Sequence, residues 1–395
     1  MEPVADDEFI YLDNNATTPL DSAVIEEMLP FLTRYYGNPS SGYAFAAKAR
    51  KAVELARERL AALLRCEPSE IIFTSGGTES SNAVIHSAVQ FEPRGKHLVI
   101  SSVEHSAVLR PCQDLEKRGC HVTFLDVDRD GNVDVGQVEA AIRPETALVS
   151  IMWANNETGV LFPVERIAEI CHRKGVLFHT DAVQAIGKIP IRLRDTAVNF
   201  LSLSAHKFHG PKGVGALYVN RRTRFTPLVA GGGQENGRRG GTENAAGIVG
   251  LGKAAELAGK HLIEGKCSVR SMRDRFEKAL LETVNNALVN GAGAERIPNT
   301  SSLAFEGIES SAALLLLDRH RICCSAGSAC RTGSQEASHV LRAMNPKGDG
   351  ARRSLRFSFS RFNTEAQIDH ATEIVPKVIE KLRQMSVPAP VATAL

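Results

Sequence analysis

A lysine that directly follows an apolar run is the first residue whose setting could support covalent chemistry. Lys207 ends the segment Ser204–Ala205–His206–Lys207, which comes after the predicted strand at 199–203. Partial burial at a strand end lowers the pKa of a lysine, and the neutral amine can then form a Schiff base. For one lysine taken alone, a solvated loop residue is the commoner situation.

A carboxylate follows the strand predicted at 176–179, in the segment that runs from His179 through Asp181 to Gln184. A pyridoxal phosphate site needs a Schiff-base lysine and a carboxylate on the pyridinium nitrogen, so that the ring can accept the electrons of a carbanion. Asp181 could equally cap a helix after the strand. Asp181 and Lys207 together favour such a site without deciding it.

Two more polar turns follow predicted strands. Ser75–Gly76–Gly77–Thr78–Glu79 allows a tight turn into a helix, whose exposed amides favour a phosphate, although an ordinary capped turn is as good an interpretation. The chain lacks the GxxxxGK[ST] spacing of an ATP-type phosphate loop. His105, in the turn at 102–106, could stack on a planar cofactor and move protons, or be a hydrogen-bonded loop histidine. The turn at 155–159 follows another strand and falls on the same predicted edge.

A loop of small residues at 323–334 contains Cys323, Cys324 and Cys330, with Arg331 beside the last. A thiol in such a loop next to an arginine is expected to be exposed and partly ionised, and therefore nucleophilic. Metal ligation by the three cysteines is the alternative, but the paired C-x-x-C units of a zinc site are missing.

An arginine-rich strand is predicted at 352–358. Arg352, Ser354 and Arg356 would share one side of it, because side chains alternate along a strand. A guanidinium held there could bind a substrate carboxylate in a bidentate manner. A solvated edge strand is the alternative.

Strand and helix patterns alternate from about 70 to 220, which predicts a mainly parallel sheet covered on both faces. The expected strands are 70–74, 97–100, 122–125, 147–152, 176–179, 199–203 and 215–219, and the expected helices include 44–64, 113–119, 135–142 and 164–174. After about 260 the pattern changes to helix, then strands near 302–305 and 354–358, then a helix at 365–384. We therefore expect an α/β fold with a large domain over 16–260 and a small α+β domain from 1–15 and 261–385. A disordered tail is expected at 386–395.

The composition is that of a globular chain: of 395 residues, 43% are hydrophobic and 23% charged, and the net charge is +2. This balance argues against a nucleic-acid or membrane-surface protein. No apolar run approaches the roughly 20 residues of a membrane span, and the acidic first eight residues do not resemble a signal peptide. The 8 cysteines are too sparse for a disulfide scaffold. We expect a cytoplasmic protein with reduced thiols.

Taken together, the motifs resemble the class V aminotransferase family, and within it the cysteine desulfurases of the NifS/IscS type. The resemblance runs in family order from Tyr11–Pro19 to Arg356–Ser358, nearly the whole chain. The extended loop around Cys330 resembles the long-loop group. The Cys323–Cys324 pair and the segments 238–244 and 338–342 look most like NifS.

The resemblance implies a fold-type I enzyme that uses pyridoxal 5'-phosphate, in a homodimer with the active site at the subunit interface. Lys207 would form the Schiff base, Asp181 would pair with the pyridine nitrogen, Gln184 with the ring hydroxyl, and His105 would stack on the ring. The other residues implied in cofactor or substrate binding are Gly77, Thr78, Ser204 and His206 at the phosphate, Thr242 from the partner subunit, and Asn38, Asn156 and Arg356 at the substrate.

The implied reaction converts L-cysteine to L-alanine and leaves the sulfur on Cys330 as a persulfide, for transfer to an iron–sulfur scaffold protein. Supply to nitrogenase and housekeeping supply are equally compatible with the sequence, and so is activity on selenocysteine. The alternatives are a selenocysteine lyase, a cysteine β-lyase or a true aminotransferase on the same fold. A metal- or redox-binding scaffold that uses the three loop cysteines is the alternative from a different class.

Overall fold

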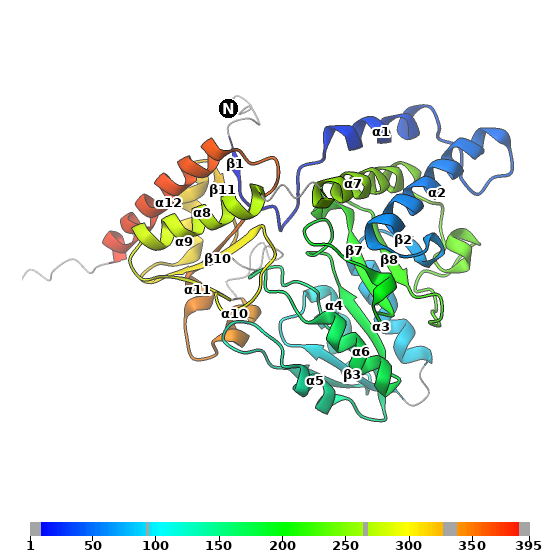
Figure 1. Cartoon of the computed structure of the whole chain (residues 1–395), viewed down its shortest axis with the longest axis horizontal. Coiled ribbons are helices and arrows are strands. Elements are labelled where there is room, and N and C mark those ends of the chain that lie inside the picture. The colour runs from blue at the N-terminus through cyan, green and yellow to red at the C-terminus, as the bar shows by residue number, and fades with distance from the viewer. Residues whose placement is uncertain (1–8, 92–94, 264–267, 327–337, 387–395) are drawn as a thin grey trace, which may run out of the picture. The chain divides into compact units, whose positions relative to one another are not determined.

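The structure is a computed structural model, which describes residues 9–91, 95–263, 268–326 and 338–386 (Figure 1). The chain divides into two compact units. The larger comprises Thr17–Asn156 and Val160–Lys266, and the smaller comprises Met1–Ala16, Glu157–Gly159 and Cys267–Leu395. The domain bounds expected from the sequence stay a prediction, and the expected tail lies, apart from Ser386, outside the described residues.

The larger unit is built on a seven-stranded sheet with the order β2-β8-β7-β6-β5-β3-β4. β8 runs antiparallel to both of its neighbours and the other pairs are parallel, so the predicted mainly parallel sheet is confirmed. The strands are β2 (Ile71–Thr74), β3 (His97–Ser101), β4 (His121–Leu125), β5 (Thr146–Ser150), β6 (Leu177–Asp181), β7 (Phe200–Ser204) and β8 (Gly215–Val219).

Helices of the larger unit pack against its sheet and against one another. They are α1 (Ser22–Thr33), α2 (Ala44–Leu64), α3 (Gly77–Phe91), α4 (Ser106–Lys117), α5 (Val135–Ala141), α6 (Val164–Lys174) and α7 (Ala245–Ile263). Every residue of β2, β3, β5, β7 and β8 is buried, whereas the edge strand β4 is partly exposed. Strands buried throughout read as near-continuous apolar runs, which is why the sequence showed them clearly.

The smaller unit has two sheets. β9 (Ala287–Val289), β10 (Thr300–Phe305) and β12 (Ser354–Ser358) form an antiparallel sheet with β10 in the centre, and β1 (Ile10–Tyr11) pairs in parallel with β11 (Ile322–Cys323). Its helices are α8 (Ser268–Thr283), α9 (Ser310–Arg319), α10 (His339–Met344), α11 (Gly350–Arg353) and α12 (Glu365–Ser386). The ring of Phe276 packs against those of Phe357 and Phe359 at centroid distances of 4.9 and 5.4 Å, in the core of this unit.

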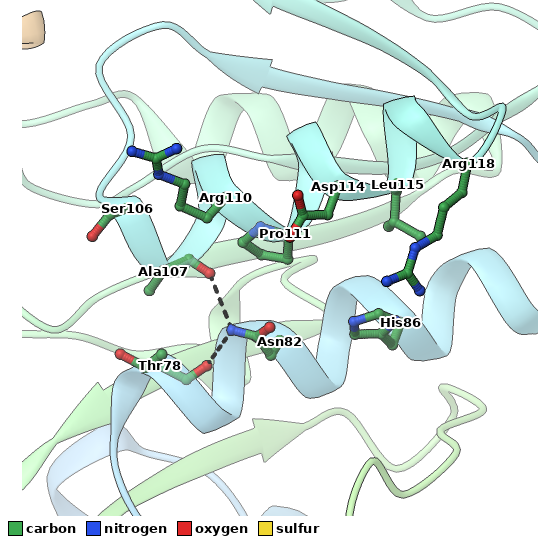
Figure 2. A pocket seen from close by; sticks show the side chains of 10 residues that line it. All are labelled: Thr78, Asn82, His86, Ser106, Ala107, Arg110, Pro111, Asp114, Leu115 and Arg118. Carbon is green, nitrogen blue, oxygen red and sulfur yellow. Dashed lines mark hydrogen bonds between the residues drawn. The ribbon is translucent and has the colours of Figure 1, made fainter.

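Two predicted elements differ from the structure. Arg352 belongs to α11, and β12 begins only at Ser354. The prediction that Arg352 shares a strand face with Arg356 is therefore wrong. α4 begins at Ser106 rather than near 113 and passes through Pro111. Pro111 has no N–H for the carbonyl of Ala107, and Asn82 of α3 donates a hydrogen bond to that carbonyl at 3.5 Å instead (Figure 2).

No helix among the described residues combines the length and the apolar character needed to cross a membrane.

Candidate active site

The candidate residues of the larger unit gather at the edge of the sheet where β2, β6 and β7 end. These strands run in the same direction, because β8 is antiparallel to both β2 and β7. Asp181 is the last residue of β6 and Ser204 the last of β7, so each lies at the end of its strand rather than after it. Ligands of open α/β sheets bind at this edge.

The turn from β2 into α3 lies against both of these strand ends. A methyl group at Gly77 would come within 2.5 Å of Val183 Cγ2 and 3.9 Å of Ser204 Cβ. Gly76 adopts φ +155°, and a methyl group there would lie 3.6 Å from Ser204 Oγ. The β2–α3 turn, the turn after β6 and the end of β7 therefore pack closely together at the N-terminus of α3, a 15-residue helix. Such a terminus offers free amides and a positive dipole end to an anion.

A salt bridge ties this turn to the Gly-rich loop at 231–242. Arg239 binds the carboxylate of Glu79 through Nε at 2.9 Å and through Nη2 at 3.2 Å, while Glu79 Oε2 accepts a hydrogen bond from the Ser75 amide at 2.8 Å. Thr242, which is exposed, lines a cavity of about 190 Å³ together with Ser75 and Arg239. The structure thus places Thr242 beside the turn within one chain.

Asp181 is 5% exposed, and its Oδ1 accepts a hydrogen bond from the Val183 amide at 2.9 Å. Burial raises the pKa of this carboxyl, and the charges of His105 and Lys207 oppose the rise. These two sequence-predicted residues therefore lie within electrostatic reach of Asp181. A buried carboxylate with cationic neighbours is suited to binding a protonated ring nitrogen.

His105 and Lys207 are each held at the start or end of a helical turn. His105 caps α4, its Nδ1 accepting the Ala107 amide at 3.1 Å, so the neutral ring carries its proton on Nε2. Lys207 ends the short 3-10 helix Ala205–Lys207 that follows β7 directly. Its neighbour His206 contacts Thr17 Oγ1 through Nδ1 at 3.1 Å, and burial together with the charge of Lys207 lowers the pKa of His206 to about 4.

The remaining candidates of the larger unit lie in nearby turns. Gln184 is buried after β6, and its Oε1 accepts a hydrogen bond from Lys188 at 2.6 Å. Thr78 is exposed in the first turn of α3 and lines, with Ser106, one end of a cavity of about 330 Å³ between α3 and α4 (Figure 2). Asn38 Oδ1 accepts the Ser40 amide at 2.9 Å, and Asn156 is half-buried in the turn after β5.

In the smaller unit, Arg356 is 1% exposed and lies in β12. Its Nη2 forms an ion pair with Asp13 Oδ1 at 2.6 Å. β12 is an edge strand of its sheet, but Arg356 is buried. The alternative interpretation of this arginine as a solvated residue is therefore wrong. Cys330 lies outside the described residues.

The described residues on either side of the Cys330 segment are anchored by side chains. Ser325 Oγ donates to Asp13 Oδ2 at 2.9 Å, and Ser338 Oγ donates to Glu157 Oε2 while also accepting the Leu341 amide at the start of α10. Burial raises the pKa values of the Cys323 and Cys324 thiols. A thiol with a raised pKa is mostly protonated and is a poor nucleophile. Cys323 and Cys324 therefore do not fit the nucleophilic role expected for Cys330.

Comparison with known proteins decides the family. A model described as aminotransferase class-V matches residues 10–370. The chain belongs to the class V aminotransferase family.

Similar class V aminotransferases cover nearly all of this chain. It is 52% identical to a protein named cysteine desulfurase from Gluconacetobacter diazotrophicus over 95% of each chain, and 51% identical to one from Klebsiella pneumoniae over 95% of this chain and 94% of the other. The solved structure of a NifS-like protein matches with a TM-score of 0.88 at 38% identity, covering 94% of this chain and all of the other. The larger unit therefore has the fold-type I architecture that the resemblance implied.

Within each unit of this class V aminotransferase, two carboxylates that hold candidate segments were not singled out as site residues from the sequence. Asp13, Glu79 and Glu157 each hold a residue of a predicted motif, namely Arg356, Ser75 and Ser338, and Glu104 itself lies in the His105 turn and binds Ser101. Glu104 is fully buried, accepts hydrogen bonds from Ser101 Oγ at 2.7 Å and from the Met152 amide at 2.9 Å, and stands beside His105. The sequence signal that could have identified these residues is a carboxylate within a motif of otherwise apolar or small residues.

Proposed function

We propose that this cysteine desulfurase releases L-alanine from L-cysteine and takes the sulfur atom onto Cys330 as a persulfide. The observation that carries the proposal is the meeting of Gly77, Ser204 and the Asp181 turn at one edge of the sheet. It occurs in a chain about 50% identical to proteins named cysteine desulfurase over nearly its full length. One solved structure of 37% identity is that of "SspA in complex with cysteine".

Pyridoxal 5'-phosphate fits the donors found there. The backbone cradle at Gly77 and Thr78, with Ser204 and His206, suits a phosphate, and Asp181 suits the pyridinium nitrogen. Gln184 would bind the ring hydroxyl and His105 would stack on the ring, with Asn156 nearby. When bound, the cofactor supplies an electron sink for charge that develops at the substrate Cα.

Lys207 is proposed as the residue that holds the cofactor and then moves the Cα proton. Lys207 directly follows β7, and its charge acts on both Asp181 and His206, so its amine lies within electrostatic reach of the residues proposed to bind the cofactor. Arg356 would bind the substrate carboxylate, and Asn38 and Asn156 would help to orient the substrate.

Cys330 is proposed as the sulfur acceptor. Its thiolate attacks the substrate sulfur, so that an S–S bond forms while the bond between Cβ and sulfur breaks. The electron pair of the broken bond stays on the carbon, which takes up a proton and leaves as the methyl group of alanine. The persulfide then passes its outer sulfur to an acceptor, for which we propose an iron–sulfur scaffold protein, in a homodimeric enzyme of the cytoplasm.

Product analysis tests the proposal. The purified enzyme is incubated with L-cysteine and a thiol reductant without oxygen, and alanine, sulfide and pyruvate are quantified together. Equal amounts of alanine and sulfide are expected. Pyruvate with sulfide would mean β-elimination, and a colourless, metal-containing protein without turnover would mean a scaffold. Selenocysteine in place of L-cysteine tests the lyase alternative.

Substitution of the proposed acceptor gives a sharper result. Cys330→Ala is expected to leave a yellow enzyme that still binds L-cysteine, seen as a change in its visible spectrum, but that forms no protein persulfide. Cys324→Ala is the matched control, because burial raises the pKa of that thiol and makes it a poor nucleophile. Sustained sulfide release by Cys330→Ala would contradict the assignment.

A further inference from the structure

Asp13 joins two parts of the smaller unit that the proposed function keeps apart. Its Oδ1 lies 2.6 Å from Arg356 Nη2, and its Oδ2 accepts a hydrogen bond from Ser325 Oγ at 2.9 Å. Arg356 is the arginine proposed to bind the substrate carboxylate. Ser325 stands one residue before the end of the described segment that leads to Cys330.

The backbone makes this arrangement rigid. Ser325 and Arg356 form an antiparallel bridge with hydrogen bonds of 3.1 and 2.6 Å, and Asp13 forms a parallel bridge with Ser358. Asp13 therefore lies in a strand-like segment beside β12. Main-chain pairing thus fixes the backbone of Asp13, and Arg356 and Ser325 hold its carboxylate.

The guanidinium of Arg356 needs such a partner. Its side chain is 2% exposed, and a buried cation is costly unless a nearby anion and hydrogen bonds compensate it. A guanidinium carries its five N–H donors in one plane, so a carboxylate that holds Nη2 sets the orientation of the whole group.

We propose that Asp13 is a positioning residue for substrate recognition: it fixes the plane of Arg356 for the substrate carboxylate and ties that arginine to the start of the Cys330 segment through Ser325. The inference rests on the proposed role of Arg356. It assigns Asp13 no contact with substrate or cofactor.

Ligands that differ in the carboxylate alone test the proposal. Dissociation constants of the holoenzyme for the product L-alanine and for L-alaninamide are measured by calorimetry, together with kcat and KM for L-cysteine. Asp13→Asn keeps the size of the side chain and removes its charge. It is expected to weaken L-alanine binding on the order of tenfold, to leave L-alaninamide within about twofold, and to raise KM more than it lowers kcat.

The opposite sign would overturn the proposal. If Asp13 merely competed with the substrate for Arg356, removing its charge would tighten L-alanine binding. An equal loss for both ligands would show a general structural defect and would also count against the proposal.

Glu277→Gln is the matched control. Glu277 likewise holds one arginine and one serine, binding Arg296 at 2.8 Å and accepting from Ser301 Oγ at 2.7 Å. Ser301 neighbours the position paired with Arg356 in the sheet, so its side chain points to the other face. This variant is expected to change neither ligand's affinity beyond about twofold.

Two further variants separate this inference from the proposed function. If Arg356→Lys binds L-alanine as the parent does, the carboxylate role of Arg356 fails, and the inference fails with it. If Arg356→Lys loses affinity while Asp13→Asn does not, only the role of Asp13 is overturned. Should Asp13→Asn not fold, Ser325→Ala is expected to weaken L-alanine binding two- to threefold, and an unchanged affinity would count against the proposal.

Discussion

Two buried carboxyls stand near each other in the larger unit and are held in different ways. Burial raises the pKa of both Asp181 and Glu104. At Asp181 the charges of His105 and Lys207 oppose that rise, whereas at Glu104 the nearby Asp181 adds to it, and the pKa of Glu104 reaches about 8. Cationic neighbours thus partly offset the cost of an anion at Asp181, whereas the surroundings of Glu104 favour the protonated acid.

Gly77 is the residue whose side chain would most directly disturb the proposed phosphate cradle. Gly77→Ala would place its Cβ 2.5 Å from Val183 Cγ2, so the Val183 side chain or one of the two turns must shift. We expect a loss of about 1–3 kcal/mol in the free energy of unfolding. The affinity of the apoenzyme for pyridoxal 5'-phosphate, measured by spectroscopic titration, should fall about tenfold or more.

Gly42→Ala controls for a glycine substitution as such, because a methyl group there meets nothing within 4 Å. It should leave both quantities near the parent values. Unchanged cofactor affinity in Gly77→Ala would exclude the turn from the phosphate site.

At the scale of elements, Glu104 links the end of β3 to the segment after β5, through Ser101 and the Met152 amide. Because its pKa is raised in the folded protein from an ordinary value of 4.5 to about 8, the folded state binds the proton more tightly than the unfolded state does. The stability that this gives is present in full below about pH 4.5, and it is lost as pH rises through about 8.

Glu104→Gln should therefore gain stability relative to the parent as pH rises. The amide keeps an oxygen for both hydrogen bonds and does not ionise. Between pH 6 and pH 9, urea unfolding should show a relative gain of about 1 kcal/mol or more, since one pKa unit corresponds to about 1.4 kcal/mol. In Glu277→Gln no such change with pH is expected, because Arg296 helps to hold the pKa of Glu277 below its usual range. A parallel pH dependence in Glu104→Gln and the parent would show that Glu104 does not titrate in this interval.

Elements whose residues carry a strong local pattern were predictable, and those defined by distant partners were not. α2 has the predicted bounds, since its apolar residues recur at helical spacing over 21 residues. β1 and β11 have two residues each and show no periodicity. The types of the site residues could be identified from their motifs, but the contacts of Asp13 could not, because Ser325 and Arg356 lie 312 and 343 positions away.

At the scale of the whole molecule, the proposed homodimer makes a prediction about Thr242. The structure places Thr242 beside Ser75 of its own chain, while the resemblance implies that it acts on the partner's cofactor. Inactive Lys207→Ala subunits mixed with Thr242→Val subunits should regain activity, because one site of each mixed dimer would then combine Lys207 with an intact Thr242.

Unfolding and refolding the two variants together, followed by an assay of alanine formation, measures this recovery. Each variant refolded alone is the control. If the mixture gives no more activity than the average of the separate samples, Thr242 serves the site of its own chain.

The first residues of the chain are made early and complete the smaller unit late. Asn14 and Asn15 bond to Ser358 and Thr300, and β1 pairs with β11, so this strand has no partner until most of the polypeptide has been synthesised. At about 5–20 residues per second, the 344 residues between Asn14 and Ser358 take roughly 20–70 s to translate. The larger unit has all its strands before then, so during vectorial synthesis on the ribosome the N-terminal strand stays unpaired until the late strands of the smaller unit have been made.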